Sequence, residues 1–317
     1  MNSPTHPFPD SIRVFAPATV ANVACGFDIF GFAVDSPGDE VVLRKRERPG
    51  VEITEITGDA GRLPRQTEKN TAGVAIAAFL RHIGSDQGVA VTLHKKMPLG
   101  SGLGSSAASA VAGVFAINQL MGNPLSPADL LPFAMEGERL ACGSAHADNV
   151  APSLLGGFVV IRSYQPLDII RIPTPDRLYC TLVHPQIEVN TKDARHILKK
   201  EISLQKTITQ MGNVAGLIAG LMQADYALIG RSLVDVIVEP VRAILIPGFG
   251  EVKVAALGAG ALGCSISGSG PSMFALSSDA DTAAGVGAAM QARFAHLRIE
   301  SEVYVSGINR VGPVVME

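Results

Sequence analysis

From residue 98 the chain reads Pro98-Leu99-Gly100-Ser101-Gly102-Leu103-Gly104-Ser105-Ser106-Ala107-Ala108, a glycine- and serine-rich loop that runs directly into an alanine-rich helix. The first turn of a helix has four free N–H donors and the positive end of the helix dipole, so this junction predicts an anion site that holds phosphate. The loop lacks both the Gly-Lys-Ser/Thr of a P-loop and the glycine spacing of a dinucleotide fold. The alternative is a flexible loop before a buried helix.

The composition indicates a globular protein with two domains. The chain has 317 residues, of which 47% are hydrophobic and 17% charged, and it contains no tryptophan. Domains usually hold about 100–200 residues. A net charge of −3 provides no cationic field for a nucleic-acid backbone, so we expect no nucleic-acid partner.

Signals for export or membrane insertion are missing from the sequence. The four cysteines show neither C-x-x-C nor metal-ligand spacing, which favours reduced thiols. Residues 1–10 lack the pattern of a signal peptide, and the apolar runs stop well short of the ~20 residues of a membrane span. We therefore expect a cytoplasmic protein that does not contact a membrane.

The periodicity of the first half predicts strands and helices in one α+β protein. Strands are expected at 12–16 (ending at Pro17), 41–46, 51–56 and 89–94. We expect these strands to form an antiparallel sheet, with helices at 70–83 and 107–120. A further helix should start at Ser126 and run toward residue 141, with a kink or a late start at Pro132.

The second half is expected to begin in the polar, proline-bearing stretch 163–175, after a strand at 156–161. Gly268-Ser269-Gly270-Pro271 separates two apolar segments, which predicts a glycine-rich hairpin. The remaining expected elements are a strand at 178–183, several helices between 192 and 237, helices at 250–257 and 280–294, and a last strand at 300–305.

An acidic segment offers ligands for a metal ion. If the glycine loop holds ATP, Mg²⁺ must accompany the phosphates, and it prefers one or two carboxylates plus hydroxyl or water oxygens. Glu138 and Ser106 are the candidates. Glu138 could equally be a surface acid paired with Arg139.

His146, Asp148 and Asn149 follow in a stretch of small residues that a ligand could approach closely. Phosphoryl transfer depends more on positioning and charge neutralisation than on a strong base, so an amide such as that of Asn149 could orient an acceptor hydroxyl. The alternatives are an Asx turn at Asp148 and Asn149 and a structural role for His146.

The segment Pro17 to Asp28 contains a third polar group, Asn22 and Asp28, set among small residues. A turn is the simpler explanation. Arg195 and Arg242 each stand near an expected helix end, and arginine can grip a carboxylate through two parallel N–H bonds. Either arginine could instead form a surface salt bridge.

Taken together, these motifs resemble those of the GHMP kinases. Three signatures occur in the family's order, at residues 17–28, 98–108 and 267–271, and they span nearly the whole chain. The resemblance implies a two-domain GHMP kinase fold. Residues 1–168 would form the ATP-binding domain, which is ribosomal protein S5 domain 2-like with a left-handed β-α-β crossover, and residues 169–317 a ferredoxin-like domain.

The resemblance also implies a site that uses ATP and Mg²⁺. The whole stretch 98–108 would wrap the phosphates, Asn70 would contact the base, and Ser106 and Glu138 would hold Mg²⁺. Gly137-Glu138, the segment 146–152 and the segment 191–195 resemble the branch of the family that phosphorylates L-homoserine. Asn149 would lie near the hydroxyl of that substrate, which would be bound by Asn22, Asp28, His146, Asp148, Arg195, Arg242, Gly268 and Ser269.

The implied activity is ATP-dependent phosphorylation of the hydroxyl of L-homoserine to O-phospho-L-homoserine, a step of threonine biosynthesis. The alternatives are a mevalonate or sugar kinase of the same family and a nonenzymatic nucleotide-binding protein on the same scaffold. The implied partners are ATP and L-homoserine, and a homodimer is left open.

The chain departs from its relatives in one loop, and one catalytic role stays open. Relatives usually carry Leu-Gly-Pro or Leu-Gly-Ala where this chain has Val23-Ala24-Cys25, and losing a glycine makes a left-handed backbone costlier. Some relatives use an aspartate as a catalytic base, and the spacing leaves open whether Asp148 acts as a base or only binds substrate. We favour a reaction with no dedicated base.

Overall fold

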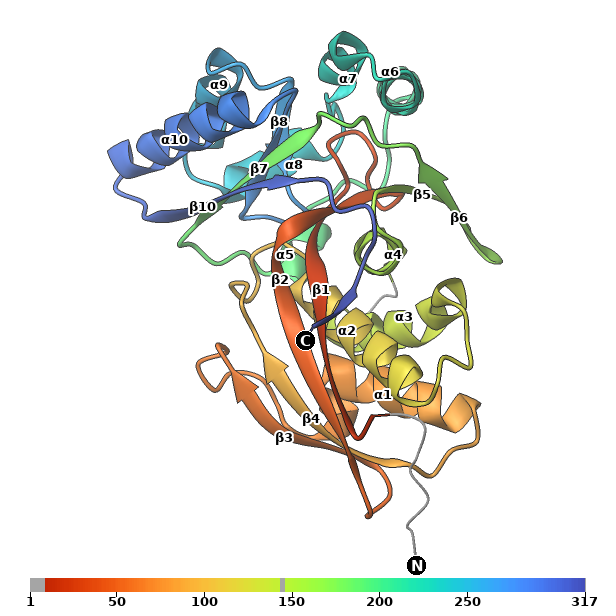
Figure 1. The fold of residues 1–317 in the computed structure, drawn as a ribbon. Helices are drawn as coiled ribbons and strands as arrows, with labels where there is room; N and C mark the ends of the chain where they lie inside the picture. The colour runs from red at the N-terminus through yellow and green to blue at the C-terminus, as the bar shows by residue number, and fades with distance from the viewer. Residues whose placement is uncertain (1–8, 143–145, 317) are drawn as a thin grey trace, which may run out of the picture.

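The computed structural model describes residues 9–142 and 146–316. Figure 1 shows two layered α+β halves, with the chain's C-terminal strand returning to the first of them. The larger sheet has the order β11-β1-β2-β4-β3, and β5 and β6 extend it beside β2. Its strands are β1 (Ser11–Ala21), β2 (Phe30–Arg46), β3 (Val51–Thr57), β4 (Gly88–His94), β5 (Phe158–Tyr164), β6 (Leu167–Ile172) and β11 (Val314–Met316).

Four helices form the layer that accompanies this sheet. α2 packs on β1 and β2 and also contacts α1, α3 and α4, so it is the central helix of the first half. Its alanines and valines are all buried, and their small size allows this close packing. The helices are α1 (Thr71–His82), α2 (Ser105–Leu120), α3 (Leu131–Cys142) and α4 (Ala147–Leu155), with short 3-10 helices η1 (Thr67–Lys69) and η2 (Pro127–Leu130).

The second sheet is antiparallel in the order β10-β7-β9-β8. α9 and α10 pack together and contact its strands, while α6 and α7 form a separate pair (Figure 1). The strands are β7 (Tyr179–Pro185), β8 (Gly263–Ile266), β9 (Met273–Ser277) and β10 (Ser301–Gly307). The helices are α5 (Thr191–His196), α6 (Leu204–Gln223), α7 (Tyr226–Ser232), α8 (Glu239–Arg242), η3 (Ala243–Leu245), α9 (Phe249–Gly258) and α10 (Ala280–His296).

A shared hydrophobic core joins the two halves. Phe32 of β2 lies with its ring centroid 4.6 Å from that of Phe158 in β5 and 6.0 Å from that of Phe274 in β9. All three side chains are fully buried. Aromatic pairs at these separations stabilise a core beyond the area they bury, so the two sheets are fixed relative to each other.

The predicted helices and the hairpin are confirmed, but two predictions for the larger sheet are wrong. β1 does not end at Pro17; it continues to Ala21 through a register shift between Pro17 and Thr19, where the missing proline N–H is tolerated. The sheet is not wholly antiparallel, because β3 pairs with β4 in parallel across the α1 connection.

Pro132 has the predicted effect. The expected helix from Ser126 is divided into η2 and α3, and Pro132 is the second residue of α3, where its missing N–H is harmless. β6 is a strand that the sequence does not predict, and it spans residue 168 within the larger sheet. The division of the chain at residue 168 stays a prediction.

Candidate active site

Hydrogen bonds bring the three signature segments together. The N–H of Thr19 in β1 donates to the carbonyl of Leu103 at 3.0 Å, and the N–H of Gly268 donates to the carbonyl of Ala21 at 3.2 Å. The Ser267 hydroxyl donates to the carbonyl of Gly102 at 2.8 Å. Segments that lie far apart in the sequence therefore form one structural unit around the glycine loop.

The glycine loop needs its glycines at two close approaches. Gly102 and Gly104 have φ of 79° and 71°, in the left-handed region. A Cβ on Gly102 would overlap the carbonyl oxygen of Ser267, and one on Gly104 would overlap the Thr19 hydroxyl. Gly104 is the N-cap of α2, and no side chain of the described residues caps that end. The first-turn N–H groups of α2 are thus available to an anion.

A cavity of about 430 Å³ lies beside this loop. It extends from the glycine loop to the hairpin at Gly268 and to the arginines of α5 and α8. The predicted site residues that line it are Asn22, Asp28, Asn70, Leu99, Gly100, Ser101, Gly102, Gly104, Ser105, Ser106, Glu138, His146, Asp148, Asn149, Arg195, Arg242, Gly268 and Ser269.

Four residues predicted within the phosphate stretch do not line this cavity. Leu103, Ala107 and Ala108 are fully buried in the hydrophobic core, where they hold α2 against the sheet. Pro98 is partly buried and stands at the beginning of the loop. Their side chains shape the loop from behind, and a role of their backbone toward phosphate stays a prediction.

Glu138 and Ser106 form a pair inside the cavity. The Ser106 hydroxyl, at the start of α2, donates to Glu138 Oε2 of α3 at 2.7 Å, and Glu138 is only 3% exposed. The described residues contain no cluster of three or more His, Cys, Asp or Glu side chains that could hold a metal ion by themselves. A carboxylate beside a hydroxyl is nevertheless a donor set that suits Mg²⁺ when phosphate and water supply the remaining oxygens.

Asp148 is a buried acid with an unused acceptor. It lies in the first turn of α4 and is 3% exposed, and its Oδ1 has no hydrogen-bond partner among the described residues. Burial raises the pKa of Asp148 to about 7, with further contributions from the negative charges of Asp28 and Glu138. Asp148 could therefore bind a cation in the cavity as a carboxylate.

Asn149 is fixed by a contact across the fold. The Thr19 hydroxyl donates to Asn149 Oδ1 at 2.8 Å, so the amide group of Asn149 has a defined orientation. A Cβ at Gly104 would come within 2.9 Å of the same oxygen. The amide therefore lies directly beside the end of the phosphate loop.

Asp28 and Arg195 form a two-point ion pair at the other end of the cavity. Arg195 Nη2 lies 2.6 and 2.8 Å from the two carboxylate oxygens of Asp28. His146 Nδ1 is 3.6 Å from Asp28 Oδ1. Burial lowers the pKa of His146, and the positive charges of Arg195 and Arg242 lower it further. The negative charge of Asp28 raises it but does not reverse the shift, so the imidazole is neutral near pH 7.

Arg242 is buried and held by carbonyl groups. Its Nε donates to the carbonyl of Ala194 and its Nη1 to that of Gly268, each at 3.0 Å. Burial and the nearby Arg195 lower the pKa of Arg242 to about 10, which still leaves it charged near pH 7. The Phe27 ring lies 5.0 Å from the Arg242 guanidinium carbon and 5.3 Å from that of Arg195, and such contacts stabilise cations.

Asn22 and Asn70 have structural contacts within the site. The Asn22 Nδ2 donates to the carbonyl of Gly268 at 2.8 Å, and its Oδ1 accepts from the N–H of Asp28 at 3.0 Å. The Asn70 Oδ1 caps α1 by accepting from the N–H of Ala72 at 3.1 Å and of Gly73 at 3.2 Å. Contact of Asn70 with a base stays a prediction.

The loop around Asn22 stores backbone strain. Asn22, Val23 and Ala24 have φ of 71°, 42° and 59°, and Asp28 has φ of 62°. The departure at Val23-Ala24-Cys25 therefore has a cost in this backbone, because Ala24 adopts the left-handed conformation that glycine would adopt more readily. Such strain persists where surrounding contacts enforce it and is frequent at binding sites.

Sequence reasoning missed several residues of the cavity. Leu63, Pro64 and Lys69 line it before α1, and Phe27 lies close to the two arginines. Asp39 of β2 and Lys95, just after β4, form a buried ion pair behind the glycine loop. Phe27 lies within the signature segment 17–28 but was not singled out there. No motif marks the other residues, because they reach the site through the pairing of strands and the course of loops.

The chain is similar to known kinases over nearly its whole length. Family models described as GHMP kinases N terminal domain and GHMP kinases C terminal match residues 70–157 and 217–296. A homoserine kinase of Chlorobium phaeobacteroides (strain BS1) is 56% identical, with 96% of this chain and 99% of that protein covered. One from Xylella fastidiosa (strain M12) is 40% identical, with 98% and 95% covered.

Solved structures show the same likeness. The crystal structure of homoserine kinase from Cytophaga hutchinsonii has a TM-score of 0.96 and 62% identity, and the match covers 99% of this chain and 100% of that one. Mevalonate kinase from L. major in complex with R-mevalonate has a TM-score of 0.73 at 16% identity, covering 97% and 99%, which shows a shared fold. With its signature segments joined around one cavity, the chain belongs to the GHMP kinase family and, within it, to the group of the homoserine kinases.

Proposed function

We propose that the protein transfers the γ-phosphoryl group of ATP to the hydroxyl of L-homoserine, giving O-phospho-L-homoserine, a step of threonine biosynthesis. The observation that carries this proposal is that the two ends of one cavity offer different kinds of polar group. Its glycine-loop end offers backbone donors for phosphates, and its other end offers acids and arginines for a zwitterion. The close similarity to homoserine kinases supports the same substrate.

At the nucleotide end, the loop and the first turn of α2 would hold the phosphates through N–H groups. Ser106 and Glu138 would hold Mg²⁺, and their hydroxyl and carboxylate oxygens fit its preference for hard ligands. When bound, Mg²⁺ neutralises charge that develops on the transferring phosphoryl group. Asn70 would contact the base from the beginning of α1.

At the amino-acid end, the two signs of charge match the two charges of the substrate. Arg195 and Arg242 would bind the carboxylate, and Asp28 and Asp148 would bind the ammonium group. Asn22, His146, Gly268 and Ser269 would complete the contacts. Neither mevalonate nor galactose has an ammonium group, so a kinase for those substrates could use one of these acids as a base but would not need both.

Asn149 would orient the acceptor hydroxyl, because its amide is fixed by Thr19 beside the glycine loop. Phosphoryl transfer through a loose transition state is promoted mainly by positioning and charge neutralisation. We therefore propose a reaction without a dedicated base, in which Asp148 binds the substrate. The new bond joins the substrate oxygen to the γ-phosphorus, the bond from that phosphorus to ADP breaks, and the hydroxyl proton passes to an oxygen of the transferred phosphoryl group. The alternative, Asp148 as the base, predicts that removal of the carboxylate lowers kcat rather than the affinity for L-homoserine.

Release of ADP, measured with MgATP and a panel of hydroxy compounds, tests the assignment. We expect activity with L-homoserine and none with mevalonate or galactose. Activity on mevalonate without activity on homoserine would contradict the proposed substrate. A protein that binds MgATP but releases no ADP with any compound would instead favour the nonenzymatic alternative.

Two further expectations concern the protein in the cell. No helix in residues 9–142 and 146–316 is long and apolar enough to cross a bilayer. We propose a cytoplasmic location, which is supported by the unpaired thiols of Cys25, Cys180 and Cys264 and by the need for ATP. The homodimer stays a prediction, and light scattering coupled to size-exclusion chromatography measures it.

A further inference from the structure

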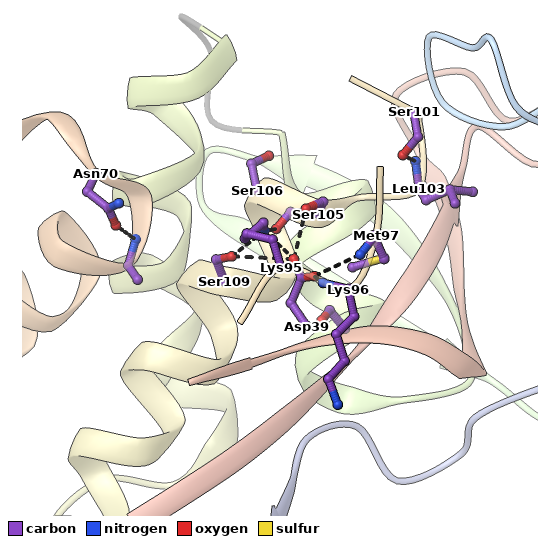
Figure 2. A network of polar contacts seen from close by, with 12 residues as sticks. Asp39, Asn70, Lys95, Lys96, Met97, Ser101, Leu103, Ser105, Ser106 and Ser109 are labelled. Carbon is purple, nitrogen blue, oxygen red and sulfur yellow. Dashed lines mark hydrogen bonds and ion pairs between the residues drawn. The ribbon is translucent and has the colours of Figure 1, made fainter. Parts of the chain in front are cut away.

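A buried ion pair lies behind the glycine loop, outside every motif of the sequence. Lys95 and Asp39 have side chains that are only 2% and 1% exposed, and they contact each other directly (Figure 2). Lys95 also lines the cavity. A lysine at the edge of a phosphate site would ordinarily be assigned to the phosphates, as in a P-loop.

The contacts of Lys95 argue against that assignment. Besides Asp39, its Nζ donates to the carbonyl of Ser105 at 2.9 Å and to the Ser109 hydroxyl at 2.6 Å. An ammonium group has three hydrogens, and these three acceptors use all of them. The Lys95 ammonium group thus donates only to groups of the protein, namely Asp39 and the first turns of α2.

Asp39 connects the two ends of the loop. Its Oδ1 accepts from the N–H of Lys96 at 2.8 Å and of Met97 at 3.3 Å, just before the loop begins. Its Oδ2 accepts from the hydroxyl of Ser105 at 2.8 Å, just after the loop ends. The neighbouring serine, Ser106, turns instead to Glu138 (Figure 2 shows it apart from this cluster).

We infer that Asp39 and Lys95 are positioning residues that clamp both ends of the glycine loop and set the direction of its N–H groups toward the phosphates. Neither residue contacts the nucleotide. The inference rests on the proposed function only in taking the loop as the phosphate site. Because the pair is neutral as a whole, it fixes the loop without adding net charge to the phosphate site.

Four proteins test the clamp: Lys95→Met, Asp39→Asn, the double variant and the control Lys96→Met. Lys96 is adjacent in sequence, but its side chain is 51% exposed and pairs with Glu40, and it does not line the cavity. Calorimetry with MgATP and, separately, with L-homoserine measures the two ends of the cavity. The control reports what the loss of one nearby positive charge does by itself.

The clamp predicts a selective and coupled effect on affinity. Lys95→Met leaves Asp39 as an unpaired buried charge, and a misplaced loop should raise the Kd for MgATP about 10- to 100-fold. The Kd for L-homoserine and the MgATP affinity of Lys96→Met should stay near those of the wild type. In the double variant both charges are gone and the amide oxygen introduced at position 39 can still accept from the backbone, so it should bind MgATP at least about fivefold more tightly than Lys95→Met.

Two binding results would overturn the clamp, one for each outcome of folding Lys95→Met. A double variant that binds MgATP as weakly as Lys95→Met, or more weakly, would make Lys95 a direct phosphate ligand and overturn the clamp. If Lys95→Met does not fold, the double variant is compared with the wild type alone. An affinity within about tenfold supports the clamp, and a loss beyond about tenfold overturns it.

Hydrogen exchange separates the clamp from the proposed function, because it needs no nucleotide. In the unliganded protein the amides of residues 99–104 should exchange faster in Lys95→Met than in the wild type and in Lys96→Met. Unchanged exchange would overturn the clamp even if MgATP binding fell. A wild type that binds no MgATP would contradict the proposed function, while faster exchange in Lys95→Met would still support the clamp.

Discussion

Replacing Asp148 by asparagine should stabilise the unliganded protein above pH 7 while weakening its binding of L-homoserine. The carboxylate is buried, one of its oxygens has no partner among the described residues, and it faces the negative charges of Asp28 and Glu138. An ionised Asp148 is therefore unfavourable in the folded protein until a cation arrives. Asparagine keeps the shape of the side chain and removes the charge.

The magnitude follows from the pKa of Asp148, which rises from 3.8 to about 7 on folding. As the pH rises through 3.8, the unfolded chain releases this proton while the folded chain keeps it, so the native state loses stability until the pH passes about 7. At about 1.4 kcal/mol per pH unit, the full loss is about 4 kcal/mol, of which about 2–3 kcal/mol falls between pH 5 and pH 8. Asparagine does not titrate, so it avoids this loss.

The assay is urea unfolding of both proteins at pH 5 and pH 8. The difference in unfolding free energy between Asp148→Asn and the wild type should grow by about 2–3 kcal/mol from pH 5 to pH 8. Asp176→Asn, at a side chain that is 90% exposed, is the matched control and should show no such growth. A constant or shrinking difference for Asp148→Asn would refute the reasoning.

The same variant separates the two roles of Asp148 in catalysis. If the carboxylate binds the ammonium group, its loss should raise the KM for L-homoserine about 10- to 100-fold, with a smaller effect on kcat. If it is the general base, kcat should fall by about 100-fold or more. The second result would contradict the reaction without a dedicated base.

Three further substitutions test other parts of the site. Arg195→Ala should raise the KM for L-homoserine about 10- to 100-fold, because a charged contact is lost. The affinity for MgATP, measured by calorimetry, should stay unchanged. An equal loss of affinity for L-homoserine and for MgATP would contradict the proposed arrangement of the site. Gly104→Ala places a Cβ against the Thr19 hydroxyl at a φ of 71°. It should lower the free energy of unfolding by about 1–3 kcal/mol and weaken the binding of MgATP. A variant with unchanged stability and binding would show that the loop is less constrained than its geometry indicates. Ala24→Gly relieves a φ of 59° and should stabilise the protein by about 0.5–1 kcal/mol in urea unfolding, since the relief of strain exceeds the added chain entropy; destabilisation would mean that Ala24 is not strained.

The sequence could predict those parts of the fold and site that depend on local chemistry. The glycine loop before α2 and the hairpin at Gly268 follow from residues that permit a left-handed backbone, and both lie at the predicted positions. The break before α3 follows from the missing N–H of Pro132. The family resemblance then predicted that the three signature segments form one site, which the local sequence patterns do not indicate.

The parts that could not be predicted depend on pairing between distant strands. Glu40 of β2 lies opposite His94 of β4, and this register brings Asp39 beside Lys95. Nothing in the residues around either position marks them as partners. The same holds for the parallel pairing of β3 with β4, because periodicity identifies a strand but not its neighbour.

On the proposed function, each charge that the unliganded site must offer is either paired or held back until the substrate binds. Arg195 and Asp28 neutralise each other, Arg242 is held by two carbonyl groups, and the raised pKa of Asp148 keeps much of it protonated near pH 7. A zwitterion can replace the Arg195–Asp28 pair with two ion pairs of its own and give Asp148 the cation that it lacks. A substrate with only a carboxylate would break the first pair and leave Asp28 uncompensated. The preference for an amino acid therefore arises as much from the contacts that must be broken as from those that form.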